Sequence, residues 1–172
     1  MSHPLEYYVR SLGQISLSAF LERIDCPVLV ESVVGGDDAH DNERAFRTEF
    51  VSVDELDGPG LGSMIQGEVL LVKKKEGALF SGHIGVGRTP NLDVCIPRHG
   101  ISKFHGYFSV DPNGGYRITD KDSKNGTYLD GKRLEPGVAT PIGNSAELRF
   151  AAHAFRFMMP DAFYQLVQSY AA

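Results

Sequence analysis

The sequence predicts a mainly β fold, an antiparallel β-sandwich with a small amino-terminal αβ extension and a carboxy-terminal helix. From Gly67 onward, short apolar runs recur at regular intervals with turn residues between them, the pattern of a sandwich. The chain has 172 residues, of which 19 are Gly and 9 are Pro, which favours many turns over long helices. This length corresponds to about one domain, at roughly 150 residues each.

The first 66 residues predict the αβ extension. Ser16 can cap a helix, since apolar residues follow it at helical spacing: Leu17, Phe20, Leu21 and Ile24. Pro27 ends this pattern, and the apolar residues 28–30 predict a short buried strand that 33–34 follow. Alternating residues predict a further strand over 46–50, and the Gly- and Pro-rich residues 57–63 predict a linker.

Beyond Gly67 the expected elements are nine strands and one helix. The strands are expected over residues 68–74, 78–87, 94–96, 105–110, 116–119, 128–129, 132–134, 146–150 and 154–159. A helix follows Pro160, and its apolar residues form one stripe: Phe163, Leu166, Val167 and Tyr170. We expect residues 161–172 to pack on the core.

The charge is unevenly distributed along the chain. The formal net charge of −5 at pH 7 disfavours a general nucleic-acid binder, which needs a basic surface. Residues 1–66 hold 4 Lys and Arg against 12 Asp and Glu, a net charge of −8, whereas residues 67–172 carry a net charge of +3. The two parts are therefore expected to present different surfaces.

Neither the cysteines nor the apolar runs indicate a secreted or membrane protein. Cys26 and Cys95 lie far apart and match no metal-ligand spacing, and the six histidines lie at no zinc spacing. Glu6 and Arg10 interrupt any apolar run that could form a signal peptide. The apolar runs also fall far short of the ~20 residues needed to cross a membrane. We expect a cytoplasmic protein with ordinary thiols, no membrane contact, no metal and no cofactor.

Three short polar clusters lie in the β region. They are 87–88 (Gly-Arg), 102–105 (Ser-Lys-Phe-His) and 123–127 (Ser-Lys-Asn-Gly-Thr). A guanidinium, a hydroxyl, two ammonium groups and an amide suit a phosphate dianion beside a peptide backbone, because the guanidinium pairs with phosphate oxygens and the amide can hold a main chain. If the three loops meet at one rim of the sandwich, they form an anion and peptide site.

Taken together, the clusters resemble the signature of the forkhead-associated (FHA) domain, a reader of phosphothreonine peptides. That signature is Gly-Arg, then Ser-x-x-His, then Asn-Gly-Thr, and all three parts occur here in this order. The resemblance covers residues 67–159 and implies an FHA/SMAD-like sandwich as a domain at 67–160. It leaves the role of residues 1–66 open.

The resemblance implies a role for each signature residue. Arg88 and Ser102 would bind the phosphate, Lys103 and Lys124 would contribute charge beside it, and Asn125 would hydrogen-bond the peptide main chain. The other signature residues would be architectural: Gly87, His105, Gly126 and Thr127. Gly100, near the position usually linked to selectivity, offers no charge.

The expected function is recruitment of a partner that a Ser/Thr kinase has phosphorylated on threonine. We do not expect an enzyme, because no Ser lies in a nucleophile elbow and no other catalytic motif is complete. The alternative is an interaction domain that does not read phosphate. It could be masked in cis by the acidic amino-terminal segment, or it could form a homodimer. The sequence leaves the oligomeric state, the kinase and the partner open.

Overall fold

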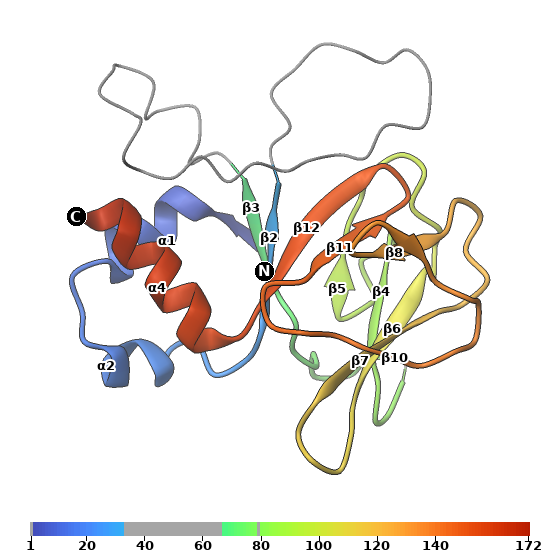
Figure 1. Ribbon diagram of the computed structural model, residues 1–172, viewed down its shortest axis with the longest axis horizontal. Helices are drawn as coiled ribbons and strands as arrows, with labels where there is room; N and C mark the ends of the chain where they lie inside the picture. Colours follow the sequence, from blue (N-terminus) through green and yellow to red (C-terminus); the bar gives the residue numbers. More distant parts are fainter. Residues whose placement is uncertain (1, 33–66, 79) are drawn as a thin grey trace.

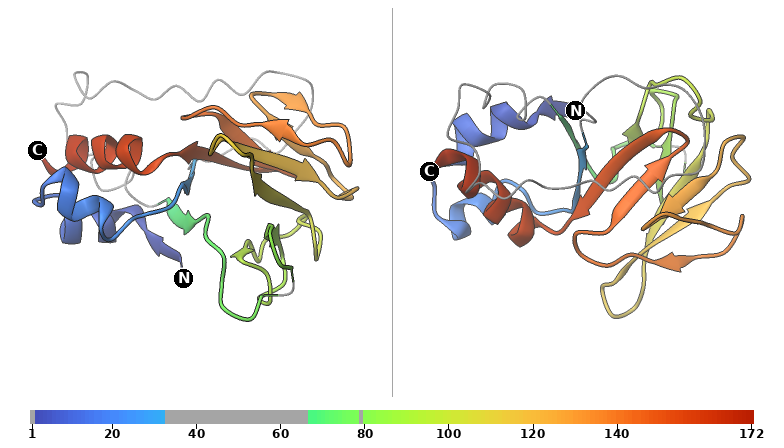
Figure 2. Two further views of the ribbon diagram at one scale, coloured as in Figure 1. Left: turned by 90° about the horizontal axis from the view of Figure 1, so that it is seen from below. Right: turned by 45° about the horizontal axis from the view of Figure 1, so that its top comes forward.

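The computed structural model of this protein describes residues 2–32, 67–78 and 80–172. Within these residues, two β-sheets lie at one end of the molecule and the helices gather at the other (Figure 1). The two further views show the same division (Figure 2). The predicted mainly β sandwich with helices at its two chain ends is therefore confirmed.

The larger sheet has the strand order β1-β3-β2-β12-β11-β8-β9 and the smaller sheet the order β10-β7-β6-β4-β5. The strands of the larger sheet are β1 (Ser2–Pro4), β2 (Val28–Glu31), β3 (Glu68–Leu71), β8 (Thr127–Leu129), β9 (Lys132–Arg133), β11 (Glu147–Phe150) and β12 (His153–Met158). Those of the smaller sheet are β4 (Ile84–Gly87), β5 (Val94–Cys95), β6 (Gly106–Val110), β7 (Tyr116–Asp120) and β10 (Thr140–Pro141). Among the described strands, all pairs are antiparallel except β4 with β5, which is parallel.

Strand β2 is apolar at consecutive positions because both of its faces are covered. Leu29 packs into the core between the two sheets, whereas Val28 and Val30 pack against the helices on the outer face. Alternation of side chains along a strand makes this division possible. Strand β2 pairs with β3 on one side and β12 on the other, so the amino-terminal segment and the last strand share one sheet.

Three described helices cover the outer face of the larger sheet: α1 (Leu5–Leu12), α2 (Leu17–Leu21) and α4 (Pro160–Ala171). Helix α1 was not expected from the sequence, although its buried residues recur at helical spacing: Leu5, Tyr8 and Leu12. Helix α4 is confirmed, and it begins at Pro160 because proline suits the first turn, where its missing N–H has no partner to lose. No helix among the described residues is both long and apolar enough to cross a membrane.

The predicted stripe of α2 is only half correct. Ser16 caps the helix, since its side chain accepts from the amide of Ala19 at 3.4 Å. Phe20 is fully buried, but Leu17 and Leu21 remain 40% and 38% exposed. The helix lasts only five residues, and Phe20, which contacts Phe163 and Tyr164 of α4, is its one buried residue. Ile24, just beyond the end of the helix, is also buried.

The expected strand over 78–87 begins only at Ile84. The Asp93 carboxylate holds the preceding turn instead, since it accepts the amides of Lys75 and Gly85 and the Lys74 ammonium at 2.7–2.9 Å. Three sequence predictions lie outside the described residues: the continuation of the strand at 33–34, the strand over 46–50 and the linker over 57–63. The expected domain boundary after residue 66 stays a prediction.

Candidate functional site

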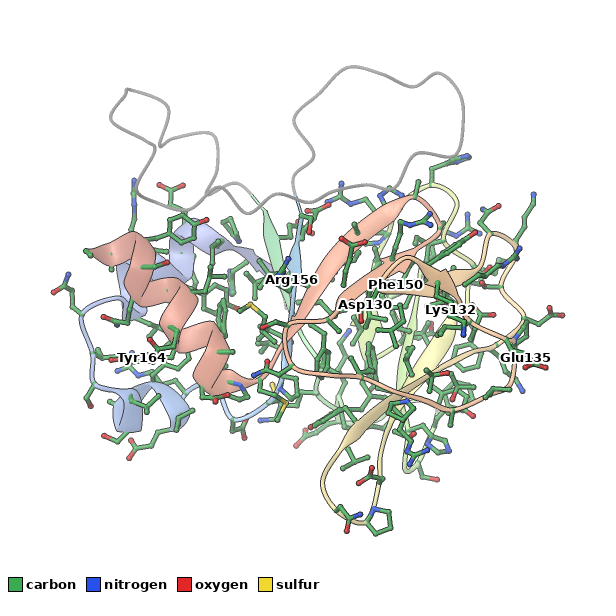
Figure 3. The ribbon with its side chains drawn as sticks, viewed as in Figure 1. Asp130, Lys132, Glu135, Phe150, Arg156 and Tyr164 are labelled. Atoms are coloured by element: carbon green, nitrogen blue, oxygen red, sulfur yellow. The ribbon has the colours of Figure 1, made fainter. Side chains whose placement is uncertain are left out.

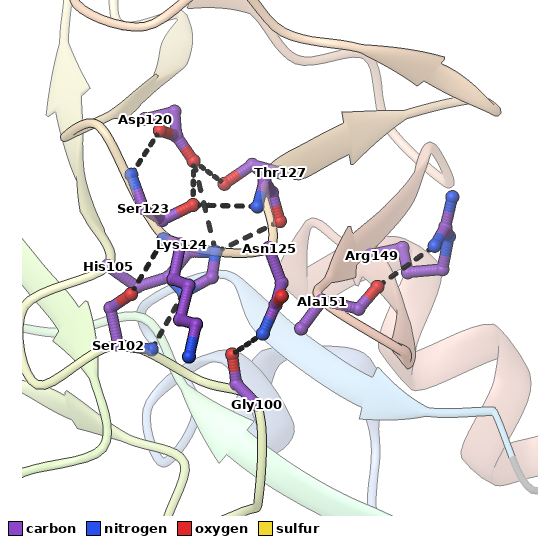
Figure 4. A network of polar contacts seen from close by, with 11 residues as sticks. Gly100, Ser102, His105, Asp120, Ser123, Lys124, Asn125, Thr127, Arg149 and Ala151 are labelled. Carbon is purple, nitrogen blue, oxygen red and sulfur yellow. Dashed lines mark hydrogen bonds and ion pairs between the residues drawn. The ribbon is translucent and has the colours of Figure 1, made fainter.

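The three polar clusters are joined by hydrogen bonds through Ser102, and Figure 4 shows the second and third of them. Arg88 follows β4, Ser102 lies in the loop before β6, and Lys124 lies in the loop between β7 and β8. The Arg88 amide donates to the Ser102 carbonyl at 3.0 Å, and the Lys124 amide donates to Ser102 Oγ at 3.1 Å. The contact between loops that the site hypothesis required is therefore present.

The polar side chains at this rim are accessible to a ligand. Arg88, Lys103, Lys124 and Asn125 are exposed, and Ser102 is half-buried. Within residues 2–32, 67–78 and 80–172, no hydrogen bond or ion pair engages the side chains of Arg88, Lys103 or Lys124. The rim thus presents three cations around one hydroxyl.

The side chain of Asn125 is held by a backbone group. Its Nδ2 donates to the carbonyl of Gly100 at 2.8 Å. Gly100 has a φ of +83°, and a Cβ there would lie 3.3 Å from that nitrogen. Only glycine adopts this backbone without strain, so Gly100 serves the site by presenting its carbonyl rather than by carrying a charge.

His105 lies beneath the rim and joins two of the loops. Its Nδ1 accepts the Ser102 amide at 3.1 Å, and its Nε2 lies 3.1 Å from the carbonyl of Gly126. A carbonyl can only accept, so Nε2 carries the proton and the ring is neutral. Burial lowers the pKa of His105, and the Gly126 carbonyl and Asp120 oppose this without reversing it. The architectural role expected for this histidine fits these contacts.

Asp120 organises the loop that carries Lys124 and Asn125. Its carboxylate accepts the Ser123 amide at 2.9 Å, the Ser123 hydroxyl at 2.7 Å and the Thr127 hydroxyl. Burial alone would raise the pKa of Asp120, but the hydrogen bonds from Thr127 and Ser123 outweigh it and lower the pKa. Ser123 Oγ in turn accepts the Gly126 amide at 3.0 Å, which closes the loop.

Two of these residues were missing from the predicted site. Ser123 was given no role within the third cluster and Asp120 lay outside it, yet their hydrogen bonds shape this cluster. A signal existed in the spacing, because an aspartate can accept the amide of a residue shortly after it and so organise a turn. Their burial, which gives the network its importance, was not visible in the sequence.

We expect Gly87→Ala to lower the free energy of unfolding by about 2 kcal/mol, within the range for overpacked sites. A Cβ at Gly87 would lie 2.5 Å from the Lys103 carbonyl and 2.8 Å from Leu92 Cδ1, so the loop that carries Lys103 would have to move. Urea unfolding measures the loss. Gly143→Ala is the matched control because nothing lies within 4 Å of its added Cβ. Equal stabilities of the two variants would contradict this prediction.

We expect the free energy of unfolding to decrease as the pH falls below about 6.5, the usual histidine pKa. Because the pKa of His105 is lower in the folded protein, the unfolded chain takes up this proton first, and acid favours unfolding in that window. Urea unfolding at several pH values from 7.5 to 5 measures the slope. His105→Gln should flatten it, whereas His83→Gln, at an exposed position, should not. The same slope in all three proteins would count against this account.

Comparison with known proteins agrees with the geometry. The family model of the FHA domain matches residues 84–151, which include all three clusters. A search of curated protein sequences found no match. Similar solved structures include the N-terminal FHA domain of Saccharomyces cerevisiae Rad53p in complex with a phosphothreonine peptide. The two are 21% identical over 49% of this chain and 73% of that chain, with a TM-score of 0.43.

Two further structures are similar over a comparable region. Mycobacterium tuberculosis EmbR in complex with a low-affinity phosphopeptide is 23% identical over 45% of this chain, with a TM-score of 0.41, and the match spans only 20% of EmbR. An FHA domain from Arabidopsis thaliana is 26% identical over 45% of this chain and 66% of that chain, with a TM-score of 0.42. The family match shows that residues 84–151 of this chain form an FHA domain.

Proposed function

We propose that this protein binds threonine-phosphorylated peptides at the rim formed by Arg88, Ser102 and Lys124. The convergence of these three residues, from three separate loops, is the observation that supports the proposal most. A phosphorylated side chain carries about −1.5 to −2 charge at pH 7 and three acceptor oxygens. The accessible cations and the hydroxyl match that charge and those acceptors.

The hydrogen bonding of Ser102 supports a role as a donor to phosphate. Its Oγ already accepts the Lys124 amide, so its own hydroxyl proton can donate to another acceptor. The Arg88 guanidinium offers paired N–H groups that match two phosphate oxygens. Lys103 and Lys124 add charge without needing a fixed geometry, which suits two flexible exposed side chains.

Asn125 is proposed to hydrogen-bond the peptide main chain beside the phosphothreonine. Its amide group is oriented by Gly100 at the rim and is exposed. An amide side chain has two donors and one acceptor. One donor is used by Gly100, so the group retains the capacity to pair with a peptide backbone.

The mechanism is equilibrium binding, because the matched family is a non-catalytic binding module. FHA domains are phosphothreonine-binding modules, and the Rad53p domain was solved with such a peptide. We propose that the partner is a protein phosphorylated on threonine by a Ser/Thr kinase and that binding recruits it.

Titration of fluorescent peptides by polarisation tests this function. We expect a phosphothreonine peptide library to contain sequences that bind with micromolar Kd, about −8 kcal/mol. The same sequences with unmodified threonine should bind far more weakly, and phosphoserine versions should bind less well than phosphothreonine versions. Binding that is indifferent to phosphatase treatment would contradict the proposal and favour the alternative of an interaction domain that does not read phosphate.

A further inference from the structure

The site depends on a short loop, residues 97–101, that runs from β5 to Ser102. This loop supplies the Gly100 carbonyl that orients the Asn125 amide. Two backbone hydrogen bonds form within this loop and to the residue before it. The Arg98 amide donates to the Ile96 carbonyl at 2.8 Å, and the Ile101 amide donates to the Arg98 carbonyl at 3.4 Å. Contacts from outside the loop therefore contribute to its position.

The Arg98 side chain joins this loop to the strands that precede the matched FHA region. Its Nη2 lies 3.1 Å from each carboxylate oxygen of Glu31, at the end of β2, and 3.7 Å from Oε2 of Glu68, at the start of β3. Glu31 also accepts the Glu68 amide at 3.3 Å, so the two strand ends form one acceptor group.

This contact is more than a single exposed ion pair. The Glu31 side chain is only 17% exposed, while that of Arg98 is 40% exposed. Isolated surface ion pairs contribute little to stability, whereas a network around a partly buried carboxylate contributes more. On the other side of the loop, Nε2 of His153 lies 2.9 Å from the His99 carbonyl. The loop is thus held from both sides, by β2 and β3 through Arg98 and by the β11–β12 hairpin through His153.

We propose that Arg98 is a positioning residue of the phosphopeptide site and that Glu31 and Glu68 hold it. This inference rests on the proposed function of the site. When these contacts hold Arg98, the loop keeps the Gly100 carbonyl within hydrogen-bond distance of Asn125 and keeps Ser102 within hydrogen-bond distance of Lys124. If the contact is lost, the loop samples other positions, and a peptide must restore the bound arrangement before it can bind, which lowers the apparent affinity.

The test is a charge swap measured on the full chain. Arg98→Glu is expected to weaken phosphothreonine-peptide binding by roughly tenfold, within the range for residues that act at a distance from a ligand. Arg98→Gln, which keeps most of the side chain, should weaken it less. The double variant Glu31→Arg with Arg98→Glu restores an opposite-charge pair and should bring the Kd back to within about threefold of the wild type.

Arg117→Glu is the matched control for the change in net charge. Arg117 is also 40% exposed, its ion-pair partner is Asp111 at 3.7 Å, and it lies beside the β6–β7 turn, at the opposite end of β6 from His105. Equal weakening by Arg98→Glu and Arg117→Glu would overturn the proposal. Weakening that the double variant does not rescue would also overturn it, because it would mean that Arg98 contacts the peptide directly.

A second measurement tests the position of the 97–101 loop in the absence of peptide. In the unbound protein, NMR signals of the Gly100 and Lys124 amides and of the Asn125 side-chain amide should shift in Arg98→Glu and return in the double variant. Unchanged signals would overturn the proposal even if peptide binding is observed. Absence of phosphate-dependent binding in the wild type would instead contradict the proposed function, which separates the two failures.

Discussion

Replacing Arg88 with alanine is expected to weaken phosphothreonine-peptide binding by about 100-fold, while the free energy of unfolding stays nearly unchanged. A paired guanidinium–phosphate contact consists of charge-assisted hydrogen bonds, each contributing about 1.5–3 kcal/mol. The Arg88 side chain is exposed and makes no polar contact with the described residues. Its loss should therefore weaken peptide binding without changing the free energy of unfolding. Calorimetric or polarisation titration measures the Kd, and urea unfolding measures stability.

Two variants separate geometry from charge in this experiment. Arg88→Lys keeps the charge but loses the paired donors, so its binding should fall between those of wild type and Arg88→Ala. Arg10→Ala removes one positive charge from an exposed side chain of α1, among the helices at the other end of the molecule (Figure 1), and should bind like wild type. Equal affinities of wild type and Arg88→Ala would show that the phosphate binds elsewhere.

Replacing Asp120 with alanine is expected to lower the free energy of unfolding by roughly 3 kcal/mol. The residue is 1% exposed, and its loss would leave the Ser123 amide, the Ser123 hydroxyl and the Thr127 hydroxyl without their acceptor. A buried donor without a partner costs about 1–3 kcal/mol, and partial rearrangement of the loop should recover some of the total. Urea unfolding at pH 7 measures the effect.

The control for this variant is Glu135→Ala. Glu135 points into solvent at the edge of the molecule (Figure 3), and its removal should change stability by less than about 0.5 kcal/mol. Asp120→Asn should be intermediate, because an amide keeps one acceptor oxygen but places an N–H group where hydroxyl donors point. If Asp120→Ala is as stable as Glu135→Ala, the network does not hold the loop as described.

The clearest sequence prediction was the sandwich, because alternation, turn residues and the FHA signature all indicated the same fold. The least accurate predictions concerned elements whose limits depend on partners distant in sequence. The strand expected over 78–87 begins only at Ile84, and the Asp93 carboxylate instead joins the turn before it to the strand through the amides of Lys75 and Gly85. Likewise, the sequence placed Leu17 and Phe20 on one helical stripe, but Phe20 is buried against α4 whereas Leu17 is 40% exposed.

For the candidate site, the residue types in the three clusters already specified the expected ligand groups: the Arg88 guanidinium, the Ser102 hydroxyl, two lysine ammonium groups and the Asn125 amide. That the clusters meet follows from the fold, in which Ser102 is hydrogen-bonded to both Arg88 and Lys124. The structure also shows that Asp120, outside the predicted set, accepts the hydrogen bonds that shape the third cluster, and that Arg98 contacts Glu31. The physical reason is that side-chain chemistry is local to the chain, whereas burial and hydrogen-bond partners arise from contacts between residues far apart in sequence.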